Sequence, residues 1–173
     1  ADLLLSPEMK STGEVIEIAS NFAMAFAKSQ NAAKNSLPKS GKVFISLCDL
    51  DKEFASTIAQ SLVDSGFTIC ATGGTEKIIS EAGIACEKVL KVSEGRPNIT
   101  DLLTNGDIVM AINTSGEQEA SKDDGKEIRR AVLRMSVPYF TTVAAAFAAT
   151  DAIKEMKTSD VSTPKSIQEY LNY

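Results

Sequence analysis

From residue 42 onward, short apolar runs alternate with segments of helical periodicity. Five of these runs, bounded by turn residues, predict strands at 43–48, 67–71, 85–90, 107–113 and 137–140. The segments between and after them place apolar residues at helical spacing, at 54–62, 75–82, 99–104, 123–135 and 142–156. This alternation predicts parallel βαβ units with right-handed crossovers. We therefore expect an α/β fold, a three-layer α/β/α arrangement around a five-stranded parallel sheet. Asp51 is placed to cap the first of these helices.

The first forty residues have a different character. Residues 9–15 form a polar, extended segment, and an Ala-rich stretch at about 19–34 has helical spacing. Leu37-Pro38-Lys39-Ser40-Gly41 ends that helix and marks a linker. We therefore divide the chain into a segment 1–40 and a domain 41–173. Within the domain, residues 157–165 are expected to be an irregular connector and 166–171 a helical turn.

Composition limits the classes of function. An apolar content of 43% over 173 residues is enough for one core. A net charge of −5 argues against nucleic acid as a partner. No apolar run approaches the ~20 residues that span a bilayer, so no membrane partner is expected. The three cysteines are an odd number within or beside predicted strands, which indicates small core residues in a reducing compartment, here the cytoplasm or, in a plant, the plastid stroma.

The chain contains no histidine. This removes the commonest acid/base group at neutral pH and the commonest zinc ligand. With three scattered cysteines, no Ser-His, Cys-His or zinc site can be assembled. We therefore predict no catalytic residues, no metal site and no cofactor in this chain.

Polar side chains follow four of the predicted strands where each strand ends. Because the carboxyl ends of parallel strands share one edge of the sheet, and ligands collect there, we expect these side chains to converge. Thr72-Gly73-Gly74-Thr75 is the turn between a strand and a helix, where glycines admit a ligand and helix N–H groups point at it. This chemistry favours a phosphate. The candidates are Ser46, Lys52, Thr72, Gly73, Gly74, Thr75, Lys91, Asn113, Thr114 and Ser115.

Each candidate also has a structural interpretation. Lys52 alone is typical of a solvated surface lysine, residues 72–75 of a helix cap, and residues 113–115 of an Asx-type turn. The loop 91–97 suits either contact with a base or ribose or an ion-paired hinge. Convergence of four loops on one edge favours the binding interpretation.

Six short motifs follow one another along the chain: MKSTGEV at 9–15, AFAK at 25–28, ATGGT at 71–75, EGRP at 94–97, NTS at 113–115 and IRR at 128–130. In this order and spacing they resemble the C-terminal region of the large chain of glutamine-dependent carbamoyl-phosphate synthase. The resemblance covers essentially the whole chain. It implies that segment 1–40 is the end of an ATP-grasp domain with a linker helix, and that 41–173 is an allosteric domain with the methylglyoxal-synthase-like fold.

The resemblance also implies a function and partners. The intact enzyme makes carbamoyl phosphate, for pyrimidine and arginine biosynthesis, from bicarbonate, ammonia and ATP with Mg²⁺ or Mn²⁺. A small glutaminase chain delivers the ammonia. The family's allosteric domain binds UMP as inhibitor and IMP as a weaker effector. Carried onto this chain, the effector phosphate falls to Ser46, Lys52, Thr72, Gly73, Gly74, Thr75 and Lys91, and the base and ribose to Asn113, Thr114 and Ser115.

The chain departs from the family pattern at three places, one of which is the loop after the fourth strand, where there is one hydroxyl residue fewer, at Ser115. The family binds the activator ornithine partly through a Tyr-Asp-Thr run, which here is Tyr139-Phe140-Thr141 and lacks the carboxylate. Tyr139 and Thr141 are therefore a remnant of that site. Asn98 follows the EGRP motif where the family commonly has histidine. The alternative function is a methylglyoxal synthase acting on dihydroxyacetone phosphate, although that family uses an Asp base beside a His, and this chain has no His.

Overall fold

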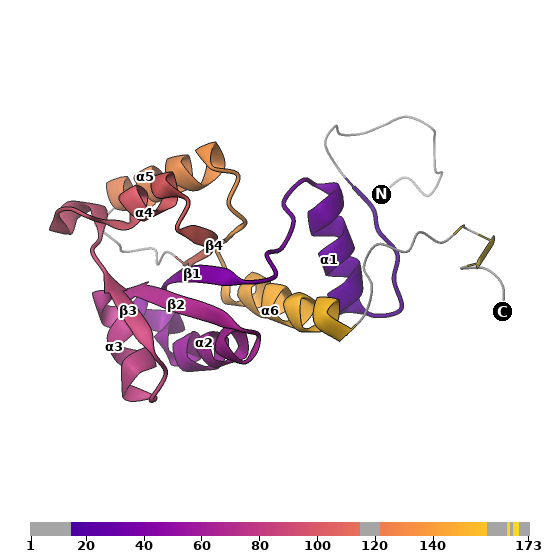
Figure 1. Cartoon of the computed structure of the whole chain (residues 1–173), viewed down its shortest axis with the longest axis horizontal. Coiled ribbons are helices and arrows are strands. Elements are labelled where there is room, and N and C mark those ends of the chain that lie inside the picture. The colour runs from indigo at the N-terminus through magenta and orange to yellow at the C-terminus, as the bar shows by residue number, and fades with distance from the viewer. Residues whose placement is uncertain (1–14, 115–121, 159–165, 167, 170–173) are drawn as a thin grey trace.

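The computed structural model describes residues 15–114, 122–158, 166, 168 and 169. Its centre is an all-parallel sheet of five strands in the order β3-β2-β1-β4-β5 (Figure 1). The strands are β1 (Gly41–Ser46), β2 (Phe67–Thr72), β3 (Cys86–Val89), β4 (Ile108–Asn113) and β5 (Tyr139–Phe140). The chain builds outward from β1 to β3 and then returns to β4 on the other side of β1. The strand order therefore reverses beside β1, where ligands bind in sheets of this kind.

Helices cover both faces of the sheet. They are α1 (Phe22–Ala32), α2 (Ala55–Asp64), α3 (Gly73–Glu81), α4 (Ile99–Asn105), α5 (Lys122–Arg134) and α6 (Val143–Thr158). Residues of α2, α3 and α6 share one core cluster with Val43 and Ile45 of β1. Residues of α4 and α5 share a second cluster with Phe44. Because successive strand residues point to opposite faces, one strand serves both cores, and the predicted three-layer α/β/α fold is confirmed.

The first helix after β1 begins differently from the prediction. A 3-10 helix, η1 (Asp49–Phe54), comes first, and the α-helix α2 begins only at Ala55. The prediction that Asp51 caps this helix was wrong, because Asp51 lies inside η1 and its carboxylate accepts a hydrogen bond from Cys48 Sγ at 3.1 Å. The tight 3-10 turn places Lys52 close to the end of β1.

The segment Thr72–Thr75, predicted as a turn between strand and helix, is already the start of helix α3. Thr72 is the N-cap of α3, and Gly73 and Gly74 are its first two residues. Neither glycine has a positive φ. Their backbone does not require glycine, so the reason for glycine lies in what surrounds them.

Helix α1 packs against α6 (Figure 1). The rings of Phe26 and Phe140 lie 6.2 Å apart, and Ala27 and Leu37 join the larger core cluster. The division of the chain at residue 40 stays a prediction. None of the described helices is long and apolar enough to cross a membrane.

Two predicted segments fall largely outside the described residues. The segment 9–15 is described only at Val15. Helix α6 continues to Thr158, where an irregular connector was predicted from 157, and the rest of that connector and most of the turn at 166–171 are outside the description.

Candidate functional site

The carboxyl ends of β1, β2 and β4 meet at one edge of the sheet. Ser46, the last residue of β1, is paired in register with Asn113, the last residue of β4. The hydroxyl of Ser46 lies 2.9 Å from that of Thr72, the last residue of β2. The edge beside β1, where strand order reverses, is therefore lined by two hydroxyls and a carboxamide.

Two further threonines bind the loop after β1. Thr75 Oγ1 accepts a hydrogen bond from the Leu47 N–H at 3.0 Å, and Thr114 Oγ1 accepts one from the Cys48 N–H at 3.1 Å. Both threonines are buried. Each hydroxyl still has its own hydrogen to donate, and neither donates to another described residue. The edge therefore holds ordered oxygens with hydrogens available to an acceptor.

Lys52 lies over the first turn of α3. A Cβ built on Gly74 would be 2.8 Å from Lys52 Nζ, so glycine at this position leaves room for the ammonium. A cation at a helix N-terminus opposes the helix dipole. In this structure the charge of Lys52 is balanced by Asp49, whose Oδ1 lies 2.5 Å from Nζ.

The charges of two lysines act on the carboxylate of Asp49. The hydrogen bond from Lys52 is the main cause that holds the pKa of Asp49 below its ordinary value, and the charge of Lys52 adds to it. The charge of Lys91 lowers this pKa further. Lys91 is thus near the same carboxylate, and the three residues form one electrostatic group at the sheet edge.

The loop after β3 is held by its own side chains. Glu94 accepts a hydrogen bond from the Lys91 N–H at 2.8 Å across the short 3-10 helix η2 (Val92–Glu94). Asn98 is buried and caps α4: its Oδ1 accepts from the Thr100 N–H, and its Nδ2 donates to the Gly95 carbonyl. Hydrogen bonds between the backbone and the side chains of Glu94 and Asn98 therefore hold the loop that contains Lys91.

Ion pairs and hydrogen bonds also fix the outer side of that loop. Arg96 pairs with Asp101 at 3.0 Å, and Ser93 donates to Asp124 at the start of α5 at 2.6 Å. These contacts are those expected of an ion-paired hinge.

Asn113, at the end of β4, forms a hydrogen bond with Tyr139 of β5. Asn113 Nδ2 donates to the hydroxyl of Tyr139 at 3.0 Å, so a residue assigned to the base or ribose contacts a residue assigned to the ornithine remnant. Phe140, the next residue, is buried in the core cluster. Thr141 is exposed. Ser115 lies outside the described residues.

Sequence reasoning missed three residues at this edge: Asp49, Lys88 and Asn98. Lys88 in β3 extends over α3, and a Cβ on Gly73 would lie 3.5 Å from its Cε. Exposed lysines are common on edge strands, so the pattern offered no reason to assign Lys88 to a site. Its position three residues before Lys91, on a predicted strand, was the only sequence signal.

None of the three cysteines, all of which are described, forms a disulfide bond. Cys48 and Cys70 are buried and Cys86 is half-buried. Burial raises the pKa of Cys70 to about 12 and that of Cys86 to about 11. Among the described residues no group of histidine, cysteine or acidic side chains has a geometry that holds a metal ion.

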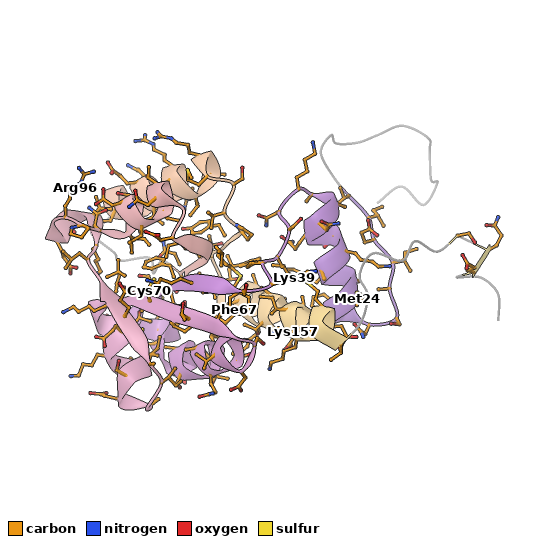
Figure 2. All side chains as sticks on the ribbon, viewed as in Figure 1. Met24, Lys39, Phe67, Cys70, Arg96 and Lys157 are labelled. Atoms are coloured by element: carbon orange, nitrogen blue, oxygen red, sulfur yellow. The ribbon has the colours of Figure 1, made fainter. Side chains whose placement is uncertain are left out.

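A hollow of about 160 Å³ lies at the opposite edge of the sheet, away from the lysines of the candidate site. It is lined by Pro38, Lys39, Ile153, Met156 and Lys157. Figure 2 shows Lys39 and Lys157 between the sheet and helix α1, and Arg96 at the far side of the sheet. We place the candidate site at the carboxyl edge because it has the hydroxyls, the lysines and the helix N-terminus, whereas the hollow is largely apolar.

Comparison with known proteins agrees with this picture. Residues 55–141 match the model of the MGS-like domain family. The chain is 48% identical over 171 residues to the carbamoyl phosphate synthase large chain of Campylobacter jejuni, covering 99% of this chain and 16% of that protein. It is 47% identical to the C-terminal section of the large chain of Aquifex aeolicus, over 90% of this chain and 29% of that protein.

The chain also resembles a plant protein in sequence and a solved structure in fold. The arginine-specific, chloroplastic large chain of rice (Oryza sativa subsp. japonica) is 48% identical, over 98% of this chain and 14% of that protein. A crystal structure of methylglyoxal synthase from Elizabethkingia anophelis superposes with a TM-score of 0.54, covering 79% of this chain and 93% of that one, at 18% identity. The structural likeness shows the fold alone.

Proposed function

The chain belongs to the MGS-like domain family, in the form found in large chains of carbamoyl phosphate synthase, and on this premise we propose that it is a regulatory domain that binds UMP or IMP. In this proposal the nucleotide controls carbamoyl phosphate synthesis, for pyrimidine and arginine biosynthesis, by shifting the intact enzyme between states of different activity. The domain itself carries no catalytic residue and holds no cofactor of its own.

The observation that supports this proposal most is the sheet edge around Thr75. The hydroxyls of Ser46 and Thr72 contact each other, and Thr75 in the first turn of α3 accepts a hydrogen bond from the loop after β1. The ammonium of Lys52 lies over Gly74 in the same turn and is paired with Asp49. A phosphate accepts hydrogen bonds from N–H, O–H and ammonium donors and is favoured at a helix N-terminus. Lys91 supplies a second cation, and Asn113 and Thr114 a place for the sugar and base. Ser115 is assigned to the same role.

The rest of the enzyme supplies the other partners in this proposal. The chain spans 16% of the length of the Campylobacter large chain, and ATP, Mg²⁺ or Mn²⁺ and a small glutaminase chain belong to the remainder. Four apolar side chains next to α1 are exposed: Val15, Ile16, Ile18 and Phe22. Such a group of apolar residues suits a contact with the preceding part of a large chain. We place the protein in the cytoplasm, or in the plastid stroma of a plant.

A second candidate is favoured by one observation, the structural likeness to methylglyoxal synthase. The same phosphate site would hold dihydroxyacetone phosphate. The lack of histidine argues against it, since the expected electrophile is missing. Incubation with dihydroxyacetone phosphate and measurement of methylglyoxal decides between them: release at an enzymatic rate would support the synthase.

Isothermal titration with UMP, IMP and uridine tests the proposal directly. We expect UMP and IMP to bind and uridine, which lacks the phosphate, to bind at least about tenfold more weakly. Circular dichroism establishes that the protein is folded under the same conditions. If the folded protein binds neither nucleotide at millimolar concentration, the proposed function is wrong.

A further inference from the structure

Lys88 lies inside β3, the strand that precedes the loop of Lys91, and the proposed site does not include it. Lys88 is paired in register with Ala71 of β2, whose side chain belongs to the core cluster shared with α2 and α3. Residues paired in register point to the same face of a parallel sheet. The side chain of Lys88 therefore leaves β3 on the face that α3 covers.

The end of this side chain lies over the first residue of α3. A Cβ built on Gly73 would be 3.5 Å from Lys88 Cε and 4.0 Å from its Nζ. The adjacent Gly74 is covered in the same way by Lys52. The ends of two lysines thus lie over one helical turn, and a Cβ would be crowded at Gly74, by Lys52, while at Gly73 it would make an ordinary contact with Lys88.

The end of the Lys88 side chain lies near the N-terminus of α3, a place that favours anions over cations. Two ammonium groups lie at the positive end of the helix dipole, where cations are disfavoured. The acidic residue in the first turn, Glu76, has its carboxylate bound by Ser80 at 2.7 Å. Lys52 pairs with Asp49, and no ion pair within the described part of the chain includes Lys88. An anion at the N-terminus of α3 would reverse the penalty for both cations.

We propose that Lys88 is a third phosphate-binding lysine, which approaches the effector's phosphate from within β3, while Lys91 approaches from the loop after β3 and Lys52 from the loop after β1. The proposal rests on the proposed function, since it adds a contact to the same site. Lys88 contacts the phosphate group and no part of the nucleoside. Its removal therefore weakens UMP and IMP by the same factor.

Titration calorimetry with UMP and IMP compares the wild-type chain with Lys88→Met and with a matched control, Lys77→Met. Lys77 is an exposed lysine of α3, and it is paired with Glu81 of the same helix. We expect Lys88→Met to raise Kd by about fivefold for both nucleotides, and Lys77→Met to change it less than about twofold. Lys88→Arg keeps the charge and should stay within about twofold of wild type. Added salt should weaken wild-type binding more than that of Lys88→Met.

The outcomes separate the two proposals. If the wild type binds UMP and Lys88→Met binds it equally well, the role of Lys88 is wrong and the proposed function stands. A loss shared equally by Lys77→Met shows a general effect of charge and also overturns the role of Lys88. If the folded wild type binds no nucleotide, both proposals are wrong. Thermal unfolding of each variant checks the fold, which an exposed methionine at position 88 should leave intact.

Discussion

The hydroxyl oxygens of Ser46 and Thr72 lie 2.9 Å apart, so side chains as well as the backbone ladder join the ends of β1 and β2. Either hydroxyl can be the donor, and the other then keeps a hydrogen of its own. The candidate site is therefore built from groups that already hold one another in place. An anion that enters meets ordered donors and does not have to order them first.

Thr75→Val should destabilise the protein. Thr75 is 1% exposed, and its Oγ1 accepts the N–H of the buried Leu47. Valine has the same shape but no oxygen, so that N–H loses its partner at a cost of about 1–3 kcal/mol. Urea unfolding measures the loss. Thr75→Ser keeps the oxygen and is the control, and equal stability of the Val and Ser variants would contradict this account.

Asp49→Asn should tighten the binding of UMP. In the structure the ammonium of Lys52 is paired with Asp49, which competes with a phosphate for the same charge. Removing the carboxylate frees Lys52 and lowers Kd by about threefold. Asp64→Asn removes an equal charge at the far end of α2, where Asp64 accepts from Gln60, and serves as the control. Weaker binding by Asp49→Asn would show that Asp49 helps to position Lys52.

The same pair predicts the pH dependence of stability. The pKa of Asp49 is lowered in the folded protein, chiefly by the hydrogen bond from Lys52. The folded state therefore holds the proton less tightly than the unfolded state, and the stabilisation is complete above the unfolded pKa of about 4 and is lost as the pH falls through the folded value. Urea unfolding of wild type and Asp49→Asn at pH 6 and pH 3 should show a difference in unfolding free energy that is larger at pH 6. Because Asp49 is exposed, the effect is small, and a larger difference at pH 3 would have the wrong sign.

Gly41→Ala should be far more damaging than Gly106→Ala. Both glycines have positive φ, +124° and +79°, which alanine adopts at a cost of about 1–2 kcal/mol. Only at Gly41 would the new Cβ also meet a neighbour, Val109 Cγ1 at 2.6 Å, whereas nothing lies within 4 Å at Gly106. Thermal unfolding should therefore show the lower Tm for Gly41→Ala. Equal losses would mean that Val109 moves aside freely.

Much of the fold could be predicted because its signals are local. The apolar run that became β1 and the helical spacing of Ile58, Ala59 and Leu62 each depend on a few neighbouring residues. Parallel pairing then follows from the alternation of strands and helices. The prediction for Asp51 failed at the same local level, because a polar residue after a strand suits a helix cap and a 3-10 turn equally well.

The sequence by itself determined that this chain forms a parallel α/β sheet and that Ser46, Thr72 and Asn113 come to one edge of it, since topology alone brings strand ends together. Only the tertiary structure decided which side chains meet there. The pairing of Lys52 with Asp49, the approach of Lys88 to Gly73 and the contact of Asn113 with Tyr139 depend on side-chain directions across separate elements. Shifts of an ångström decide such contacts, because hydrogen bonds and ion pairs weaken steeply with distance. The periodicity of a sequence does not carry positions to that precision.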